Sequence, residues 1–569
     1  MIKQTLLALA CSISLVGIGQ EENSGGTFTG NIESIFQYLN EDTLIGADQP
    51  ASKGLLNSYM NVFYTNGNFK AGLRLESYLP RIQGYPSNFD GTGIGMRYVG
   101  YTNDFVDVTL GSFYEQFGSG LSLRAYEDRA LGYDNMLDGM KIVLRPIKGV
   151  TIKGVYGYQR FAFQEGKIVH SSGIVRGIDG EVHLNQAFPS LKKSKLDIRL
   201  GGSFVSKFQL DNNSDLILPE NVGAYGGRLN LRYGKFTLDG EYILKEQDPS
   251  QDNDYIYNYG HAAVFNAGYS KKGFGIILSA KSVDNMSYRS DRTKQLQNVL
   301  INYLPSMNKT HTYNLVTSLY PYATQPTGET AFQAEVLYTI KRGSKIGGKY
   351  GTSINVNYST AYRPGRSTSS INPLDSTGVT YTTGLFAMSD SLYWSDFNIN
   401  IYRKFSKRFN LTLAYYNMIL NNDVATVAKT KGLIKSNIFV VEAGFKFKKK
   451  RSMRIELQTL LVNRRDSLDQ ETSFFAEDAK PVDKGDWATV LLEYTINSHW
   501  FVSAMDQINF GNYDKKAVHH PYLTVGYIQG STRLTASYGR QRAGLFCVGG
   551  VCRPVPASNG LTLSFTQSF

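Results

Sequence analysis

The chain has 569 residues, a formal net charge of +12 at pH 7, 42% hydrophobic and 13% aromatic residues, and 56 glycines. Beyond the first twenty residues no apolar run reaches about 18 residues, which excludes membrane-spanning helices. No linker or shift in composition divides the chain into separate domains. This mixture suits a transmembrane β-barrel, because half of each strand faces lipid and half faces a polar interior. A large soluble β-protein has a similar composition, so both classes stay open at this point.

The N-terminal segment is typical of a secretory signal peptide. A short basic start precedes an apolar stretch over 6–18, and small residues follow it before Gln20. The apolar stretch is too short to span a bilayer. We predict a signal peptide over 1–19 and one mature domain over 20–569. Lipidation at Cys11 is the alternative, which Ala8 disfavours because it is a poor residue three positions before a lipidation cysteine.

Many segments of the mature sequence alternate apolar and polar residues with period two, as 235–244 does. Such segments run about ten residues, the length that crosses a bilayer as a tilted strand. The fold class predicted is therefore all-β: a transmembrane antiparallel β-barrel of about 24 strands, within a range of roughly 22–26. The expected strands are 28–38, 57–65, 68–79, 92–101, 104–114, 138–146, 150–163, 174–185, 195–206, 224–233, 235–245, 259–270, 273–283, 330–341, 350–362, 392–404, 408–419, 435–448, 452–463, 485–496, 499–509, 521–528, 532–541 and 559–569.

The connections between these strands sort by length. Every second connection is a short turn, which we assign to the periplasm, and the others include long segments assigned to the cell exterior. An even number of strands leaves both termini of the chain on the periplasmic side. The longest expected external loops are 115–137, 284–329, 363–391 and 464–484.

Basic residues gather in the predicted periplasmic turns. The spans 145–148, 192–195, 271–272, 341–349, 403–408 and 446–451 hold many Lys and Arg residues and no Asp or Glu. We take Lys449, Lys450 and Arg451 as representative of a periplasmic basic rim. Attraction to outer-membrane lipid phosphates explains such a rim without a partner, and docking of a periplasmic or envelope-complex protein is the alternative. Nothing in this compartment implies a nucleic-acid partner.

The first long loop, 115–137, is expected to fold over or into the lumen. Three glycines within it permit positive φ or close backbone approach, and its charged residues can satisfy one another as an ion-pair network. A constriction explains these charges better than an acid/base pair, because no nucleophile or perturbing apolar pocket is nearby. The candidate lumen constriction comprises Arg124, Glu127, Asp128, Arg129 and Asp134.

Alternation also indicates which charged side chains face the interior, and both signs occur there in similar numbers. A selective channel usually has one sign of charge along its pore, so a mixed wall favours ion pairs and a filled lumen. The expected inward residues are Arg74, Glu76, Arg97, Lys141, Lys153, Asp197, Arg199, Arg232, Asp239, Glu241, Glu335, Glu442, Arg454, Glu456 and Glu493.

Two cysteines remain after signal cleavage, Cys547 and Cys552, around a Gly-Gly turn. In an exported protein this pattern predicts a local disulfide. The spacing does not fit a thioredoxin-like redox pair, and the loop offers too few ligands for zinc. No phosphate-binding loop, zinc-protease motif or hydrolase motif occurs. We therefore predict a protein that is not an enzyme and that needs no cofactor or metal.

The segment 559–569 is apolar on one face, small and polar on the other, and ends in Phe569. This pattern resembles the closing strand of outer-membrane β-barrels, although Gln567 departs from it.

A family resemblance adds to these predictions. The segments 111–121 and 123–135, together with 174–181 and 547–553, resemble the signature of an uncharacterised family of Bacteroidota outer-membrane β-barrels. The resemblance implies the fold and a location in the cell outer membrane. It brings no function and no site residues.

We therefore expect a pore or transporter for small polar solutes with a loop-constricted lumen, because a polar lumen is the common use of such a barrel. A non-conducting accessory subunit of an outer-membrane assembly, secretion or uptake complex is the alternative.

Overall fold

A computed structural model describes residues 25–368, 381–422, 433–448, 450–463, 484–512, 516–548 and 551–569. The predicted signal peptide over 1–19 and Lys449 of the basic rim lie outside the described residues. In this part of the chain, no helix has the length and apolarity needed to cross a membrane.

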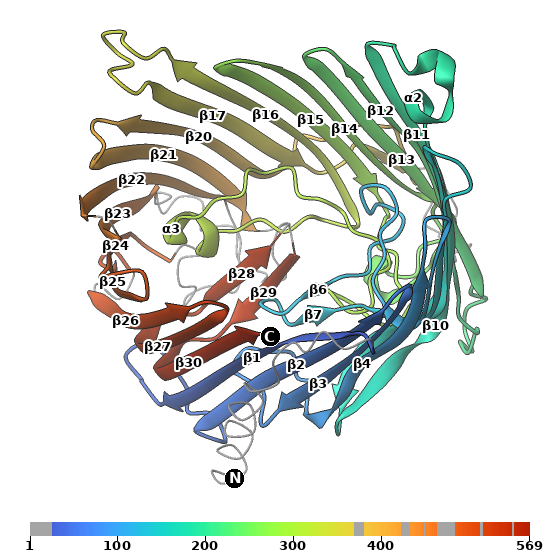
Figure 1. The fold of residues 1–569 in the computed structure, drawn as a ribbon, viewed down its shortest axis with the longest axis horizontal. Helices are drawn as coiled ribbons and strands as arrows, with labels where there is room; N and C mark the ends of the chain where they lie inside the picture. Colours follow the sequence, from blue (N-terminus) through green and yellow to red (C-terminus); the bar gives the residue numbers. More distant parts are fainter. Residues whose placement is uncertain are drawn as a thin grey trace.

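The main structure is a single sheet of 24 strands in which every neighbouring pair is antiparallel. The last strand, β30, pairs with β27 on one side and with β1 on the other, so the sheet closes into a barrel (Figure 1). The predicted fold class and strand number are thereby confirmed. The wall strands are β1 (Thr27–Asn40), β2 (Gly54–Asn66), β3 (Phe69–Tyr78), β4 (Gly91–Thr102), β5 (Val106–Phe113), β8 (Leu137–Leu144), β9 (Val150–Gln164), β10 (Lys167–His183), β11 (Leu196–Phe208), β12 (Asn221–Tyr233), β13 (Phe236–Lys245), β14 (Gly260–Lys271), β15 (Phe274–Asp284), β16 (Gly328–Ile340), β17 (Thr352–Tyr362), β20 (Leu392–Lys404), β21 (Phe409–Asn421), β22 (Leu433–Lys448), β23 (Arg451–Asn463), β24 (Trp487–Thr495), β25 (Trp500–Asn509), β26 (Val518–Gln529), β27 (Thr532–Gln541) and β30 (Ser558–Ser568).

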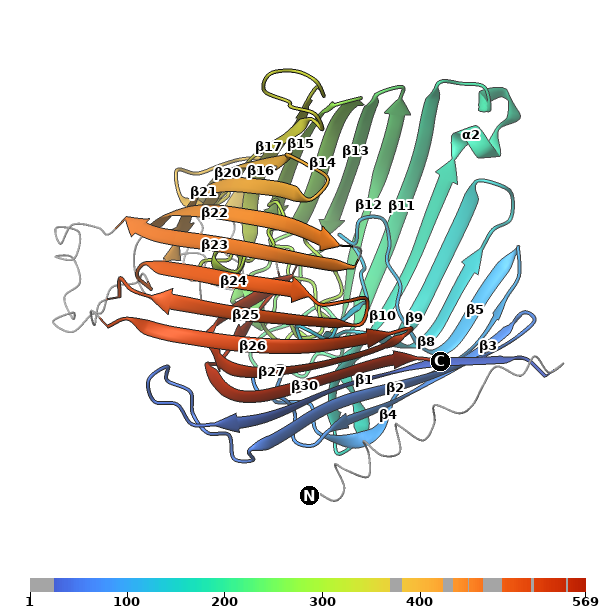
Figure 2. The ribbon, with the colours of Figure 1, turned by 60° about the vertical axis from the view of Figure 1, so that its left-hand side comes forward.

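The two ends of the barrel differ as the sequence predicted. One end, here the short-turn end, has tight connections such as 67–68, 234–235 and 530–531. The other, the long-loop end, has the connections 114–136 and 285–327. The β10–β11 connection is an exception at the short-turn end, since it forms the short helices α2 (Leu184–Ala187) and η2 (Pro189–Leu191) (Figure 2).

The outer surface of the wall is apolar. Along β13, Phe236 and Leu238 are 58% and 44% exposed, whereas the inward-facing Glu241 is buried. At the short-turn end, aromatic rings of adjacent strands touch each other, as in Phe69–Tyr101 at 5.1 Å and Phe236–Tyr269 at 4.8 Å between centroids. Period-two alternation thus places the apolar side chains outside, and a belt of aromatic residues borders them.

One inward assignment is wrong. The register between β3 and β4 shifts from Arg74↔Met96 to Leu75↔Ile94, so Gly95 is an extra residue in β4. This β-bulge moves Arg97 to the outer face, where its side chain is 55% exposed and bonds Asp138 at 3.3 Å. A Cβ on Gly95 would lie 2.1 Å from the Glu76 carboxyl group, so the bulge requires glycine.

The hydrophobic core lies inside the barrel. Chain segments from the long-loop end occupy the lumen, including the strand pair β6 (Glu127–Asp128) and β7 (Tyr133–Asp134), helix α3 (Asn314–Ser318), and the hairpin of β28 (Gly544–Val548) and β29 (Val551–Val555) (Figure 1). Two further short strands, β18 (Arg366–Thr368) and β19 (Tyr381–Thr383), pair with each other, and η3 (Gln251–Asn253) is a short 3₁₀ turn. The part of the lumen near the long-loop end is therefore occupied by the chain itself.

Candidate functional site

Two connections at the long-loop end, 114–136 and 285–327, fold into the lumen and pack together; we call them the lumen plug. The Arg124 amide donates to the Ile301 carbonyl at 2.8 Å, and the Tyr303 amide donates to the Gly120 carbonyl at 2.9 Å. The Arg124 guanidinium also lies over the Tyr303 ring, 4.0 Å from its centroid. The first long loop, expected to fold over or into the lumen, is thus found in it, together with the long loop between β15 and β16.

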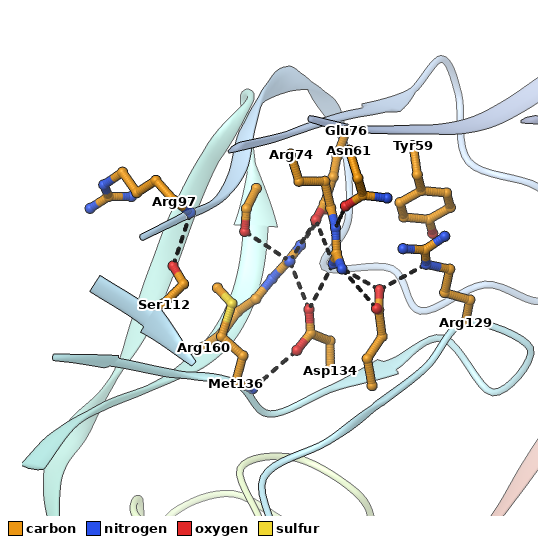
Figure 3. Close-up of polar contacts among 12 residues, drawn as sticks. Tyr59, Asn61, Arg74, Glu76, Arg97, Ser112, Arg129, Asp134, Met136 and Arg160 are labelled. Carbon is orange, nitrogen blue, oxygen red and sulfur yellow. Dashed lines mark hydrogen bonds and ion pairs between the residues drawn. The ribbon is translucent and has the colours of Figure 1, made fainter. Parts of the chain in front are cut away.

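A buried charged network holds the first plug segment to the wall (Figure 3). Arg160 on β9 donates to both oxygens of Glu76 on β3, at 2.9 and 2.7 Å, and to Asp134 of the plug at 2.9 Å. All three side chains are at most 6% exposed. A single guanidinium therefore joins two wall strands to the plug by charge-assisted hydrogen bonds.

A second group of ion pairs continues this network toward the first strand. Arg74 on β3 makes a bidentate pair with Glu127 at 2.9 and 3.0 Å. Arg129 bonds Glu127 at 3.0 Å and Glu33 on β1 at 2.6 Å. The plug charges thus pair mainly with wall strands, where a network within the loop itself was expected.

The five predicted constriction residues are all in the lumen plug, in different roles. Glu127, Arg129 and Asp134 form ion pairs. Arg124 makes ring contacts, and the Asp128 carboxylate accepts a hydrogen bond from the Leu131 amide at 3.0 Å. Their role as a constriction stays a prediction.

The plug tyrosines are buried beside this network. Burial raises the pKa of Tyr126 and Tyr133, so both phenols stay neutral at physiological pH. They contribute packing and no charge.

The tip of the first plug segment reaches strand β13. Gly118 has φ +52°, and the next amide, of Ser119, donates to the Glu241 carboxylate at 2.7 Å. A Cβ on Gly118 would lie 2.6 Å from that carboxylate, so glycine is required for this approach.

The second plug segment begins with anchors on β13 and β15. The Lys245 ammonium donates to the Ser287 carbonyl at 2.7 Å, and the Lys281 ammonium donates to the Pro305 carbonyl at 2.6 Å. Lys281 also pairs with Glu329 at 2.7 Å, and both side chains are fully buried. Inward-facing lysines thus hold the plug through its backbone.

The same segment then crosses to the opposite wall. Tyr322 stacks on Trp394 of β20 with centroids 5.5 Å apart. The Leu315 amide donates to Gln458 of β23 at 3.0 Å, and Gln507 of β25 donates to Asn314 at 2.6 Å. The plug therefore contacts the wall on both sides of the lumen.

Toward the short-turn end, the inner wall is exposed. Along a single strand, an inward-facing side chain near the short turns is solvent-accessible, and one near the long loops is fully buried. Three strands show this change: β15 with Ile277 at 42% and Lys281 at 0%, β16 with Leu337 at 44% and Glu329 at 0%, and β20 with Tyr402 at 43% and Asp396 at 0%. The lumen thus has an exposed part at the short-turn end, which we call the vestibule, and a part at the long-loop end that the lumen plug occupies.

Sequence reasoning missed the main anchors of the plug. Arg160, Lys245 and Lys281 were not assigned to the interior, nor was Lys207, which pairs with Asp248 at 2.6 Å and lies 5.8 Å from the Tyr288 ring of the plug. A lone basic residue at an inward position beside a long loop is the signal that identifies the three lysines. Alternation places Arg160 on the outer face, and the register between β9 and β10 shifts at this residue.

Two other predictions concern residues at the limits of the structure. The backbone register of β28 and β29 places Cys547 opposite Cys552, but their side chains lie outside the described residues, so the disulfide stays a prediction. Lys450 and Arg451 are exposed at the short turn between β22 and β23.

Among the described residues, no group of three or more His, Cys, Asp or Glu side chains is arranged to hold a metal ion.

The fold and the lumen define a large antiparallel β-barrel that is plugged by its own loops. The chain belongs to the family described as "Family of unknown function (DUF6029)", whose model matches residues 1–569. The predicted membership of an uncharacterised family is thereby confirmed, and the Bacteroidota origin stays a prediction. A comparison with curated proteins gives no match.

Several solved structures of outer-membrane barrels are similar to this chain. The copper transporter OprC is 10% identical, with a TM-score of 0.40 over 97% of this chain and 82% of that chain. The outer membrane transporter YddB from Escherichia coli is 8% identical, with a TM-score of 0.41 over 95% and 81%. The siderophore receptor PirA from Pseudomonas aeruginosa is 9% identical, with a TM-score of 0.38 over 95% and 80%. These scores are too low to transfer a function.

Proposed function

We propose that the protein is an outer-membrane β-barrel that lets small polar solutes pass when its lumen plug rearranges. The short-turn end then faces the periplasm, and the long-loop end faces the cell exterior. Non-enzymatic transport fits a site that has paired charges and hydrogen bonds but no arrangement for bond-breaking chemistry.

The membrane location is supported by the outer surface of the wall. Exposed Phe and Leu side chains would be costly in water over so large an area, and they match the lipid-facing band of a transmembrane barrel. The aromatic pairs at the short-turn end match an interfacial belt.

One observation carries the transport proposal: the vestibule ends on a plug that the wall holds by polar contacts. Ile277 is 42% exposed and Lys281, four residues further along β15, is fully buried. Buried ion pairs stabilise little relative to apolar packing, but they set which arrangement is adopted. A plug held by such pairs is suited to two alternative positions.

Conductance in planar bilayers tests this proposal. We expect the intact protein to be closed and a variant with residues 119–133 replaced by a short Gly-Ser linker to conduct. A second variant, which also has 291–312 replaced, should conduct more, since both plug segments fill the lumen. Removal of the exposed loop residues 212–215 is the control and should leave the protein closed.

The closed lumen also supports the second candidate, a non-conducting accessory subunit. That reading replaces the first if the intact protein and both plug variants remain silent while all of them insert as folded barrels, shown by heat-modifiable migration in gels. In that case the basic rim, with Lys450 and Arg451, is the surface to test for a periplasmic partner.

A further inference from the structure

The outer face of the wall carries an apolar groove over β11 to β15, close to the short-turn end. Its volume is about 380 Å³. The residues that line it come from five adjacent strands, and most of their side chains are apolar or aromatic. They include Leu231, Tyr233, Phe236, Leu238, Tyr269 and Leu278.

The groove exists because one outward position carries a small side chain. Ala267 on β14 lies in register between Leu238 on β13 and Leu278 on β15. Its methyl group forms a floor between two leucines. Farther from the short turns, the Phe265 ring covers Gly240, where a Cβ would lie 2.8 Å from the ring. An aromatic side chain therefore ends the groove on the side away from the turns.

The turns beside the groove are basic. The three successive turns of β10–β11, β12–β13 and β14–β15 lie next to one another because their strands are neighbours in the sheet. They contain no Asp or Glu between 184 and 195 or at 234–235 and 271–273. Their lysines are Lys192, Lys193, Lys195, Lys235, Lys271 and Lys272, all exposed and, within the described part of the chain, without an ion pair.

We propose that this groove is a binding site for one anionic phospholipid of the periplasmic leaflet. An acyl chain lies over Ala267, and the headgroup phosphate lies among Lys235, Lys271 and Lys272. The proposal rests on the membrane location given above. A phospholipid fits because it joins an apolar chain to an anion at the depth where the groove meets the basic turns. A free phosphate would use the lysines and leave the groove empty.

Lipid retention in nanodiscs tests the site. The full-length mature protein is reconstituted in phosphatidylcholine containing a small fraction of phosphatidylglycerol, and the lipids that stay bound after extraction are identified by native mass spectrometry. We expect bound phosphatidylglycerol to exceed its bulk fraction. Because each lysine near a membrane surface contributes about fivefold to the binding of an anionic lipid, the triple variant Lys235→Gln/Lys271→Gln/Lys272→Gln should lose at least about tenfold of this enrichment. Ala267→Phe, which fills the groove, should lose most of it.

Matched changes on the other side of the barrel are the controls. Lys448→Gln/Lys450→Gln/Arg451→Gln removes basic residues from another short turn, and Ala504→Phe enlarges an outward alanine on β25 that lies in register with Leu492. Both should keep the enrichment. Equal losses in all four variants would overturn the site, and loss with the lysine changes but not with Ala267→Phe would overturn the acyl-chain groove. Neither result would affect the membrane location, which is tested separately by membrane fractionation.

Discussion

At the scale of single residues, Arg160 is the side chain on which the buried network depends most. It is 2% exposed and is the direct partner of both Glu76 and Asp134. Replacing it with methionine keeps much of the volume and removes the closest cation of two buried carboxylates, with Arg74 remaining at 3.5 Å from Glu76 and 3.9 Å from Asp134. We expect Arg160→Met to lower the free energy of unfolding by about 3–5 kcal/mol. Denaturant titration in lipid vesicles, followed by heat-modifiable migration, measures this change.

Arg97 is the matched control, because it lies three strands from Arg160 in the sheet and faces outward. Its side chain is 55% exposed and that of its partner Asp138 is 13% exposed, and such partly exposed pairs contribute about 1 kcal/mol or less. Arg97→Met should therefore have little effect. The double variant Arg160→Met/Glu76→Gln should recover part of the lost free energy of unfolding, because it removes one buried carboxylate whose closest cation is gone. If Arg160→Met and Arg97→Met lower the free energy of unfolding by the same amount, the network does not hold the plug.

The residue scale was only partly predictable from sequence. Alternation assigns Arg74, Glu76 and Glu241 to the interior, because an undisturbed strand repeats with period two. It fails at Arg97, since the extra residue Gly95 in β4 interrupts the alternation and the sequence pattern does not mark this bulge. Alternation also does not indicate which charged side chains form ion pairs. Arg74 and Glu127 are far apart in the chain and meet only in the closed barrel.

At the scale of elements, the wall strands were predictable and the plug elements were not. The wall strands have an apolar outer face, so their pattern is visible in the sequence alone. In contrast, β6, β7 and α3 are very short and are held by contacts with distant strands. The positions 164–173, expected as a connection between two strands, instead extend β9 and β10. The end of this hairpin packs beside the start of β4, where the amide of Asp90 donates to the carbonyl of Phe163 at 2.8 Å.

The hairpin β28–β29 carries the predicted disulfide. Directly opposed positions in an antiparallel pair suit such a bond, and we expect Cys547 and Cys552 to be oxidised in the exported protein. Because the closed loop is short, Cys547→Ser/Cys552→Ser should lower the free energy of unfolding by no more than about 2 kcal/mol. A mass increase on reduction and alkylation checks the bond. Alkylation of both thiols without reductant would contradict it.

At the scale of the whole molecule, the orientation in the membrane is the first property to test. With Lys450 facing the periplasm, a label at Lys450→Cys should react only after the outer membrane is permeabilised. A label at Ser214→Cys, on an exposed loop at the other end, should react in intact cells. Both changes are made in the Cys547→Ser/Cys552→Ser background. The opposite pattern would reverse the orientation of the barrel.

The closed 24-stranded form was predictable because length, strand count and termini constrain one another. The vestibule was not, since it depends on how far the plug descends into the lumen. That depth is set by particular anchors such as Lys281 and Gln507, which the linear sequence does not relate to each other.

The second plug segment also has a mechanical consequence. A wide, thin-walled cylinder is flattened easily by lateral pressure, because bending spreads over many flexible strand junctions. The segment 285–327 is fixed to β9 through Ser290 and Gln159 at 2.6 Å and to β25 through Asn314 and Gln507 at 2.6 Å. It therefore acts as an internal strut that fixes the distance between two walls. Any motion that releases this strut would change the cross-section of the barrel as well as its permeability.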